Sequence, residues 1–139
     1  MRYLLDTHIF IWYAKEQDNL TTDVAAILGD YANELLLSME SVRELIVAYR
    51  VKPLLQRYWA SPVEMIDSIQ RSFGIRIIQP DMEVMRTLAK LEINTAENHH
   101  DPSDHIIISQ AITMKLPLIS SDHKFPFYIR QGLDLIYNK

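Results

Sequence analysis

The chain contains no cysteine among its 139 residues. This absence excludes a disulfide scaffold, a thiol nucleophile, a Cys-ligated zinc site and an iron–sulfur cluster. Glycine and proline are scarce, with 3 and 6 residues, while 48% of the residues are hydrophobic and 23% are charged. These values exclude collagen-like, low-complexity and intrinsically disordered chains. The length fits one domain that spans residues 1–139.

Long apolar runs are missing as well. The longest, at about Ile9 to Ala14, falls well short of the roughly 18 residues that a membrane helix needs. The first acid, Asp6, comes too early for the apolar core of a signal peptide. We therefore expect a soluble protein of the cytoplasm that makes no contact with a membrane.

The chain also has no excess of positive charge, since its formal net charge is −4. That value argues mildly against nucleic-acid binding. Basic residues nevertheless gather between Arg43 and Arg57, where Arg50 and Lys52 also lie and Glu44 is the only acid. Such a strip could contact a polyanion, although a solvated helix face explains it equally well.

Short apolar segments alternate along the chain with segments typical of helices. We expect strands at residues 3–5, 34–38, 75–78, 117–120 and 133–136. We expect helices at about residues 21–29, 38–49, 62–73, 81–91 and 101–115, with Pro53 ending or kinking the second one. This alternation predicts an α/β fold, with a mostly parallel sheet of four to five strands covered on both faces.

Two of the predicted strands run directly into acids. Leu4-Leu5 leads to Asp6, and Ser120-Ser121 leads to Asp122. Ligands bind at the carboxyl ends of the strands in sheets of this kind, so these acids are the first sign of a site. A helix cap or turn is the plain structural explanation for both.

Acids also stand at the expected starts of two helices. Ser41 to Glu44 matches a capping box, but Glu40 and Glu44 share a helix face, where like charges repel unless Arg43 or a metal offsets them.

Asp101 is a good N-cap before Pro102, and we favour this structural role for it. Asp104 lies in the first turn of the same helix and could face the strand ends without capping anything.

We interpret the histidines and the aromatic residues as structural rather than as parts of a site. The histidines at the end of the chain match no recognised zinc spacing, so we expect surface or loop positions for His99, His100, His105 and His123. We expect core or interface positions, rather than base-stacking roles, for Trp12, Tyr13, Trp59 and residues 125–128.

Four segments together resemble the PIN-domain ribonucleases, especially the VapC-type toxins. Leu4-Leu5-Asp6-Thr7-His8 resembles the first strand-ending acid of that family. Residues 37–44 resemble its Ser-x-x-Ser-x-Trp-Glu element, with Arg43 in place of Trp. Residues 100–111 resemble its His-x-Asp-Pro-Phe-Asp-Arg segment. In this chain His100 directly precedes Asp101, Ser103 replaces Phe and His105 replaces Arg. Residues 118–122 resemble its Thr-x-Asp element, with Ser120 in place of Thr.

The resemblance implies one PIN domain over residues 1–139, with a three-layer α/β/α fold. It implies catalysis and metal binding by Asp6, Glu44, Asp104 and Asp122, with Asp101 as a candidate fifth ligand. An RNA substrate, an inhibitory antitoxin protein and a homodimer are implied by the resemblance alone.

The chemistry of the acids is consistent with that implication. Two unit charges about 4 Å apart repel by roughly 4 kcal/mol at an effective dielectric constant of 20, so a carboxylate cluster needs cations or raised pKa values. Oxygen ligands suit Mg²⁺ or Mn²⁺. We hypothesise metal-assisted hydrolysis of RNA phosphodiester bonds. Thr7 and Ser120 would orient the carboxylates, and Arg43, Arg50 and Lys52 would bind flanking phosphates.

Two other functions remain open at this point. A phosphotransfer or haloacid-type hydrolase would use Asp6 as a nucleophile, but it usually needs a second Asp where this chain has His8. A non-catalytic PIN-like interaction module would need no metal, and the acidic net charge is consistent with it.

Overall fold

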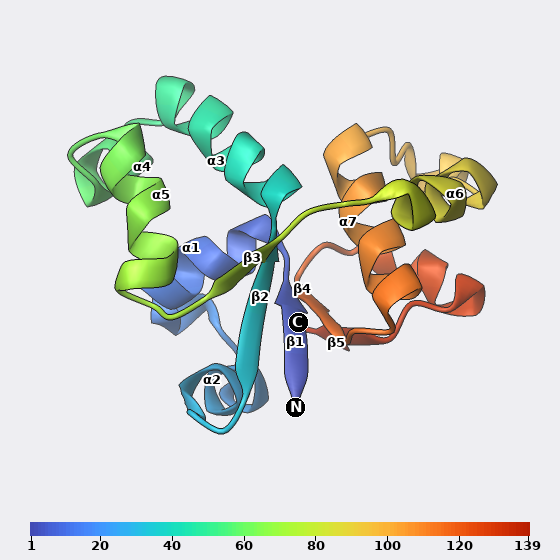
Figure 1. The fold of residues 1–139 in the computed structure, drawn as a ribbon, viewed down its shortest axis with the longest axis horizontal. Helices are drawn as coiled ribbons and strands as arrows, with labels where there is room; N and C mark the ends of the chain where they lie inside the picture. Colours follow the sequence, from blue (N-terminus) through green and yellow to red (C-terminus); the bar gives the residue numbers. More distant parts are fainter.

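A computed structural model describes all residues, 1–139, and contains one five-stranded parallel sheet (Figure 1). The strands are β1 (Arg2–Leu5), β2 (Glu34–Ser38), β3 (Arg76–Ile78), β4 (Leu118–Ser120) and β5 (Leu135–Tyr137). Their order is β3-β2-β1-β4-β5, and every neighbouring pair is parallel. The chain adds β2 and β3 on one side of β1 and then returns to the other side for β4. This reversal makes the carboxyl end of β1 a point where such folds bind ligands.

Seven α-helices connect the strands: α1 (Thr7–Lys15), α2 (Thr22–Gly29), α3 (Met39–Val51), α4 (Pro53–Tyr58), α5 (Pro62–Arg71), α6 (Met82–Lys90) and α7 (Pro102–Met114). Three short 3₁₀ helices are η1 (Gln17–Asn19), η2 (Thr95–Glu97) and η3 (Phe125–Gln131). Side-chain oxygens of Thr21, Ser61, Asp81 and Asp101 accept backbone N–H groups at the starts of α2, α5, α6 and α7. No helix is both long and apolar enough to cross a bilayer.

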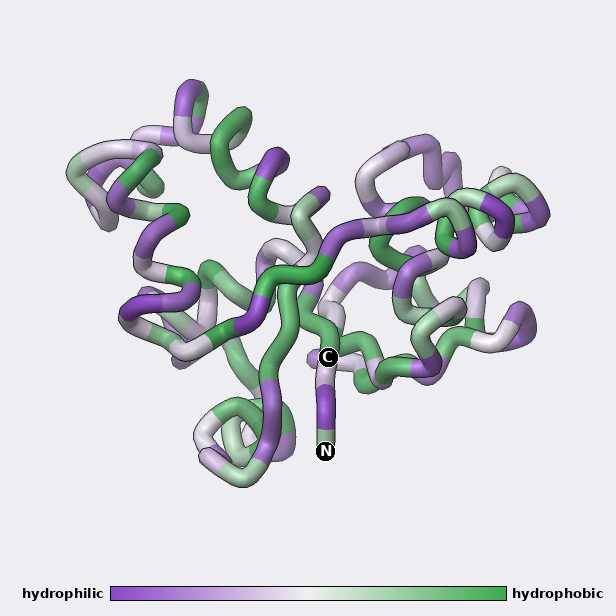
Figure 2. The backbone as a smooth tube through the Cα atoms, in the orientation of Figure 1, coloured by the Kyte–Doolittle hydropathy of each residue, from purple (hydrophilic) through white to green (hydrophobic).

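The helices cover both faces of the sheet, which confirms the predicted α/β class and its three layers. Figure 1 shows α1, α3, α4 and α5 on one side of β1 and β2, and α6 and α7 on the other. Side chains alternate along the buried strands. Leu5 and Leu37 belong to the core on the α1 side, whereas Leu4 and Leu36 belong to the core on the α7 side. Figure 2 shows the hydrophobic strands in the middle of the molecule.

The structure corrects the predicted elements at three places. Helix α1 was not predicted, because Ile9, Phe10 and Ile11 are all buried and their run shows no helical period. Pro53 does end α3, and α4 starts as a separate helix. Strand β5 begins at Leu135, since Leu133 follows the turn at Gly132, whose φ is +103°.

Candidate active site

All five predicted acids line one cavity of about 160 Å³ at the carboxyl end of the sheet. Asp6 follows β1, Glu44 lies on α3, Asp101 and Asp104 lie at the start of α7, and Asp122 follows β4. Thr7, His8, Lys52 and Ser121 also contribute to its wall. Four segments that are far apart in the sequence therefore bring carboxylates into one place.

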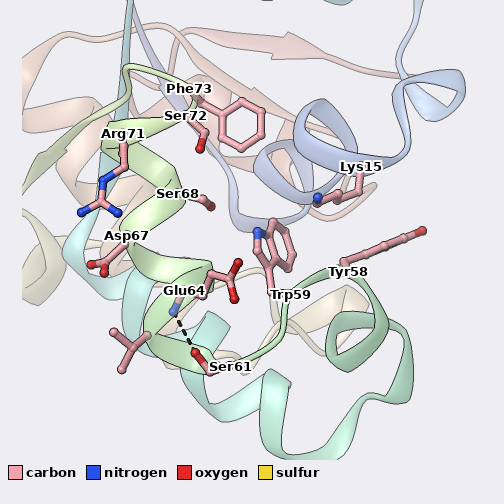
Figure 3. A pocket seen from close by; sticks show the side chains of 11 residues that line it. Lys15, Tyr58, Trp59, Ser61, Glu64, Asp67, Ser68, Arg71, Ser72 and Phe73 are labelled. Atoms are coloured by element: carbon pink, nitrogen blue, oxygen red, sulfur yellow. Dashed lines mark hydrogen bonds between the residues drawn. The ribbon is translucent and has the colours of Figure 1, made fainter.

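A larger cavity of about 560 Å³ lies between α1, α4 and α5 (Figure 3). Its lining carries both signs of charge, since Lys15 of α1 and Arg71, Glu64 and Asp67 of α5 all contribute to it. It contains none of the predicted site residues, which line the acidic cavity instead.

Asp6 is the most deeply buried of the five acids, with 6% of the residue exposed. Its Oδ1 accepts the Thr7 N–H at 2.8 Å, and its Oδ2 accepts the Ser120 hydroxyl at 2.8 Å. Asp6 is therefore the N-cap of α1 and a site residue at the same time. Burial raises its pKa, although both hydrogen bonds act in the opposite direction.

Glu44 reaches across to the start of α1. Its Oε1 accepts the Thr7 hydroxyl at 2.7 Å, and that hydroxyl also lies 2.9 Å from the Ser41 hydroxyl. The predicted capping box is wrong, because Ser38 is the N-cap of α3 and Ser41 lies inside the helix. Burial raises the pKa of Glu44 to about 7, with repulsion from Asp101 and Asp6 as further causes.

Asp101 caps α7, as expected from its place before Pro102. Its Oδ1 accepts the N–H groups of Ser103 at 2.9 Å and Asp104 at 3.4 Å. Its carboxylate also belongs to the site, since one carboxylate oxygen each of Glu44, Asp101 and Asp104 lies within 4.8 Å of the other two.

Asp104 stands at the centre of the cluster and caps nothing. Its side chain is 14% exposed, and its Oδ2 lies 2.9 Å from His99 Nε2. Burial raises the pKa of Asp104 to about 9, and repulsion from the other four acids adds to the effect. A second group of potential ligand atoms joins Asp104 to His99 and Asp122, again within 4.8 Å of one another.

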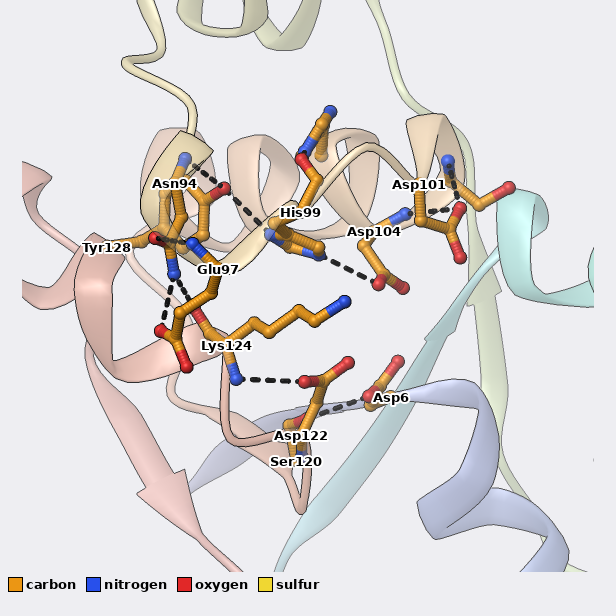
Figure 4. A network of polar contacts seen from close by, with 12 residues as sticks. Asp6, Asn94, Glu97, His99, Asp101, Asp104, Ser120, Asp122, Lys124 and Tyr128 are labelled. Atoms are coloured by element: carbon orange, nitrogen blue, oxygen red, sulfur yellow. Dashed lines mark hydrogen bonds and ion pairs between the residues drawn. The ribbon is translucent and has the colours of Figure 1, made fainter.

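Asp122 lies in a tight turn just after β4 (Figure 4). Its Oδ1 accepts the Lys124 N–H at 2.9 Å, and its own N–H donates to the Ser120 hydroxyl at 3.1 Å. Ser120 therefore ties Asp122 to Asp6 through one hydroxyl group.

No lysine or arginine forms an ion pair with any of the five acids. Arg43 instead pairs with Glu40, at 3.0 Å from Nε to Oε1, and its Nη2 donates to the Ser103 hydroxyl at 2.7 Å. Two positions that depart from the family motif, Arg43 and Ser103, thus contact each other between α3 and α7. Lys52 lines the cavity, whereas Arg50 is exposed on α3.

The expectation of surface or loop positions is right for His100 and His123, which are exposed, and wrong for His105, which is buried inside α7. His99 does lie in a loop, between η2 and α7, but it is buried. The resemblance places His100 at the motif histidine, but His99 is the one that contacts Asp104. The sequence His99-His100-Asp101-Pro102 indicates the correct residue, because His99 occupies the histidine position of the His-x-Asp-Pro motif. Buried positions for Trp59, Phe125 and Tyr128 are confirmed.

Lys124 is a further candidate site residue that the sequence pattern does not single out. Figure 4 shows its side chain extending between Asp122 and Asp104, with the amino group directed toward the acids.

The donor set fits a hard divalent cation. All five acids offer carboxylate oxygens, and no lysine or arginine forms an ion pair with them. Burial, together with repulsion from the neighbouring acids, raises the pKa of Glu44 to about 7 and that of Asp104 to about 9. Such a site suits Mg²⁺ or Mn²⁺ rather than a metal that prefers sulfur or nitrogen ligands.

The sequence model of the PIN domain family matches residues 3–128. The chain belongs to the PIN domain family. This membership confirms the predicted family and fold, and members of the family are nucleases. A comparison with curated proteins gave no match.

Solved structures support the fold assignment of this PIN domain over its whole length. It is similar to VapBC2 from Rickettsia felis bound to a promoter DNA fragment, with a TM-score of 0.71, 17% identity and 100% coverage of both chains. It is also similar to VapBC-1 from nontypeable Haemophilus influenzae, with a TM-score of 0.69, 20% identity and coverages of 99% and 98%. VapBC-5 from Mycobacterium tuberculosis, a member of the VapBC family of toxin-antitoxin systems, gives a TM-score of 0.62 at 19% identity, with coverages of 99% and 98%.

The raised pKa values of Glu44 and Asp104 predict how the stability of the metal-free PIN domain depends on pH. Unfolded Asp and Glu side chains have pKa values of about 4, so between about pH 4 and 9 the folded chain binds more protons than the unfolded one. The contribution of these groups to stability therefore falls as pH rises through this window.

Asp104→Asn should remove much of this loss. The free energy of unfolding of this variant minus that of the wild type should increase by about 1–3 kcal/mol from pH 5 to pH 8.5. Urea denaturation in a chelator measures this difference, with Asp67→Asn on α5 as the matched control. A difference that stays constant with pH would contradict the burial of a repelled Asp104 carboxyl group.

Proposed function

We propose that this PIN domain is an endoribonuclease that hydrolyses RNA phosphodiester bonds with a bound Mg²⁺ or Mn²⁺. The observation that carries the proposal is the meeting of Asp6, Glu44, Asp104 and Asp122 in one cavity without an ion pair to any lysine or arginine. Asp101 is a fifth candidate ligand, because its carboxylate lies beside those of Glu44 and Asp104.

These acids would hold the cation, and the chain's other residues would keep them in place. When bound, the cation supplies positive charge that stabilises a phosphodiester transition state and makes water a better nucleophile. Ser120 holds Asp6, and Thr7 holds both the Asp6 and the Glu44 carboxylates. In the free protein at neutral pH, Asp104 retains a proton and must release it before it can act as an anionic ligand.

Basic residues around the acidic cavity would contact the phosphates of the substrate. Lys52 lies in the wall of the cavity, and Arg43 and Arg50 lie on the same helix, α3. Lys124 would approach between Asp122 and Asp104. The choice of RNA rests on the resemblance to PIN-domain ribonucleases.

We further propose that the protein is the toxin of a toxin–antitoxin pair in the cytoplasm and forms a homodimer. The support is the similarity of fold over nearly the whole chain to structures of VapBC complexes. A cognate antitoxin protein would then be its partner.

Asp6→Asn and Asp104→Asn should each lower the rate of RNA cleavage by at least about 100-fold, since each removes a charged ligand from the site. A time course with labelled RNA in Mn²⁺ or Mg²⁺ measures the rate, and a chelator should abolish it. Asp67→Asn, which changes an acid outside the cavity, should cleave like the wild type. Wild-type rates for both site variants would reject the assigned residues, and Mn²⁺ binding without any cleavage would favour the non-catalytic module.

Expression of the wild-type chain should slow bacterial growth, because uncontrolled RNA cleavage depletes essential transcripts. The Asp104→Asn variant should not slow growth, and co-expression of a small DNA-binding protein with a basic tail, encoded beside this gene, should restore it. Growth curves after induction and co-purification measure both effects. Growth inhibition that persists in Asp104→Asn would contradict a toxin that acts through this site.

A further inference from the structure

A buried chain of hydrogen bonds connects the 3₁₀ helix η3 to Asp104 (Figure 4). The Asn94 N–H donates to the Tyr128 hydroxyl oxygen at 3.1 Å, and this oxygen lies 2.7 Å from His99 Nδ1. His99 Nε2 lies 2.9 Å from Asp104 Oδ2. His99 and Tyr128 are almost fully buried, so water does not compete for these contacts.

The available donors determine which group donates in each hydrogen bond of this series. Tyr128 accepts the Asn94 N–H, and His99 Nδ1 is the only other partner of its hydroxyl group. If Nδ1 carried a proton, the buried Tyr128 O–H would have no acceptor, which costs about 1–3 kcal/mol. The Tyr128 O–H therefore donates to Nδ1. The neutral ring then carries its proton on Nε2 and donates it to Asp104 Oδ2.

The His99 ring and backbone are both held in place by neighbouring residues. The ring packs between His105 and Phe125, with ring centroids 4.8 and 5.6 Å away. The His99 carbonyl lies 2.9 Å from His105 Nε2, and the His99 N–H donates to the Asn94 carbonyl at 3.0 Å. The Nε2–H group thus points at Asp104 from a rigid support.

We propose that His99 is a positioning residue, which holds Asp104 Oδ2 through its Nε2–H and leaves Oδ1 free for the site. This role rests on the proposed metal-dependent function of the cavity. Partners that orient metal ligands in this way typically change metal affinity by about 10–100-fold when they are removed. Tyr128 acts through His99, because its hydroxyl group determines which nitrogen of the His99 ring carries the proton.

Direct metal binding by His99 is the main alternative, since one of its ring nitrogens also lies within 4.8 Å of an Asp122 carboxylate oxygen. The hydrogen-bond chain argues against it, because Nε2 carries the proton that Asp104 accepts. Two substitutions separate these roles. His99→Gln can place an amide N–H near the position of Nε2, whereas His99→Asn reaches only as far as Nδ1.

Titration of the purified protein with Mn²⁺ by calorimetry tests the proposal. His99→Asn and Tyr128→Phe should weaken binding by about 10-fold or more, and His99→Gln should stay within about 3-fold of the wild type. Tyr49→Phe is the matched control, because it removes a hydroxyl that donates to the Trp59 carbonyl on the other side of the sheet. Thermal unfolding establishes that each variant is folded.

Each result decides between the roles. Wild-type affinity in a folded His99→Asn variant would overturn the positioning role and leave the nuclease proposal standing. Equal weakening in His99→Gln and His99→Asn would instead identify His99 as a direct ligand. Absence of Mn²⁺ binding by the wild type would reject the metal site itself.

A measurement without metal tests the hydrogen-bond chain separately. Two-bond ¹H–¹⁵N correlation spectra of the metal-free protein should show His99 protonated on Nε2 alone in the wild type. Tyr128→Phe should lose this fixed state, while Tyr49→Phe should keep it. A wild-type ring protonated on Nδ1 would overturn the proposal.

Discussion

Repulsion among closely spaced carboxyl groups, all but Asp101 partly or fully buried, is the constraint on which the site depends. Four separate segments must fold before Asp6, Glu44, Asp101, Asp104 and Asp122 come together. Burial and mutual repulsion then raise the pKa values of Glu44 and Asp104 to about 7 and about 9. The fold holds these groups together because its two cores, one on each face of the sheet, supply the stability that the acids oppose.

Neutral hydrogen-bond donors keep the acids in place without cancelling their charge. Ser120 and Thr7 hold Asp6 and Glu44, and His99 contacts Asp104. Arg43, which directly precedes Glu44 in the sequence, forms hydrogen bonds with Glu40 and Ser103 instead of with the acids of the cavity. The cavity therefore keeps a negative potential that a divalent cation would relieve, and this property connects the fold to the proposed chemistry.

Much of this arrangement could be predicted from the sequence, because it depends on local patterns. Short apolar strands ending at Asp6 and Asp122 located the carboxyl edge of the sheet, and Asp101-Pro102 located the start of α7. Helix α1 could not be predicted, since four of its first five residues are buried and its apolar run from Ile9 to Ala14 shows no helical period. The role of His99 depends on Tyr128, 29 residues away in the sequence, so only the folded structure reveals that contact.

Anomalous diffraction from crystals of the protein soaked in Mn²⁺ tests the central claim most directly, because it locates the metal without relying on activity. The account predicts an anomalous peak inside the acidic cavity, within bonding distance of Asp104 and of at least one other acid among Asp6, Glu44 and Asp122. Mn²⁺ bound only at the surface, with the five carboxyl groups still facing an empty cavity at pH 8, would contradict it.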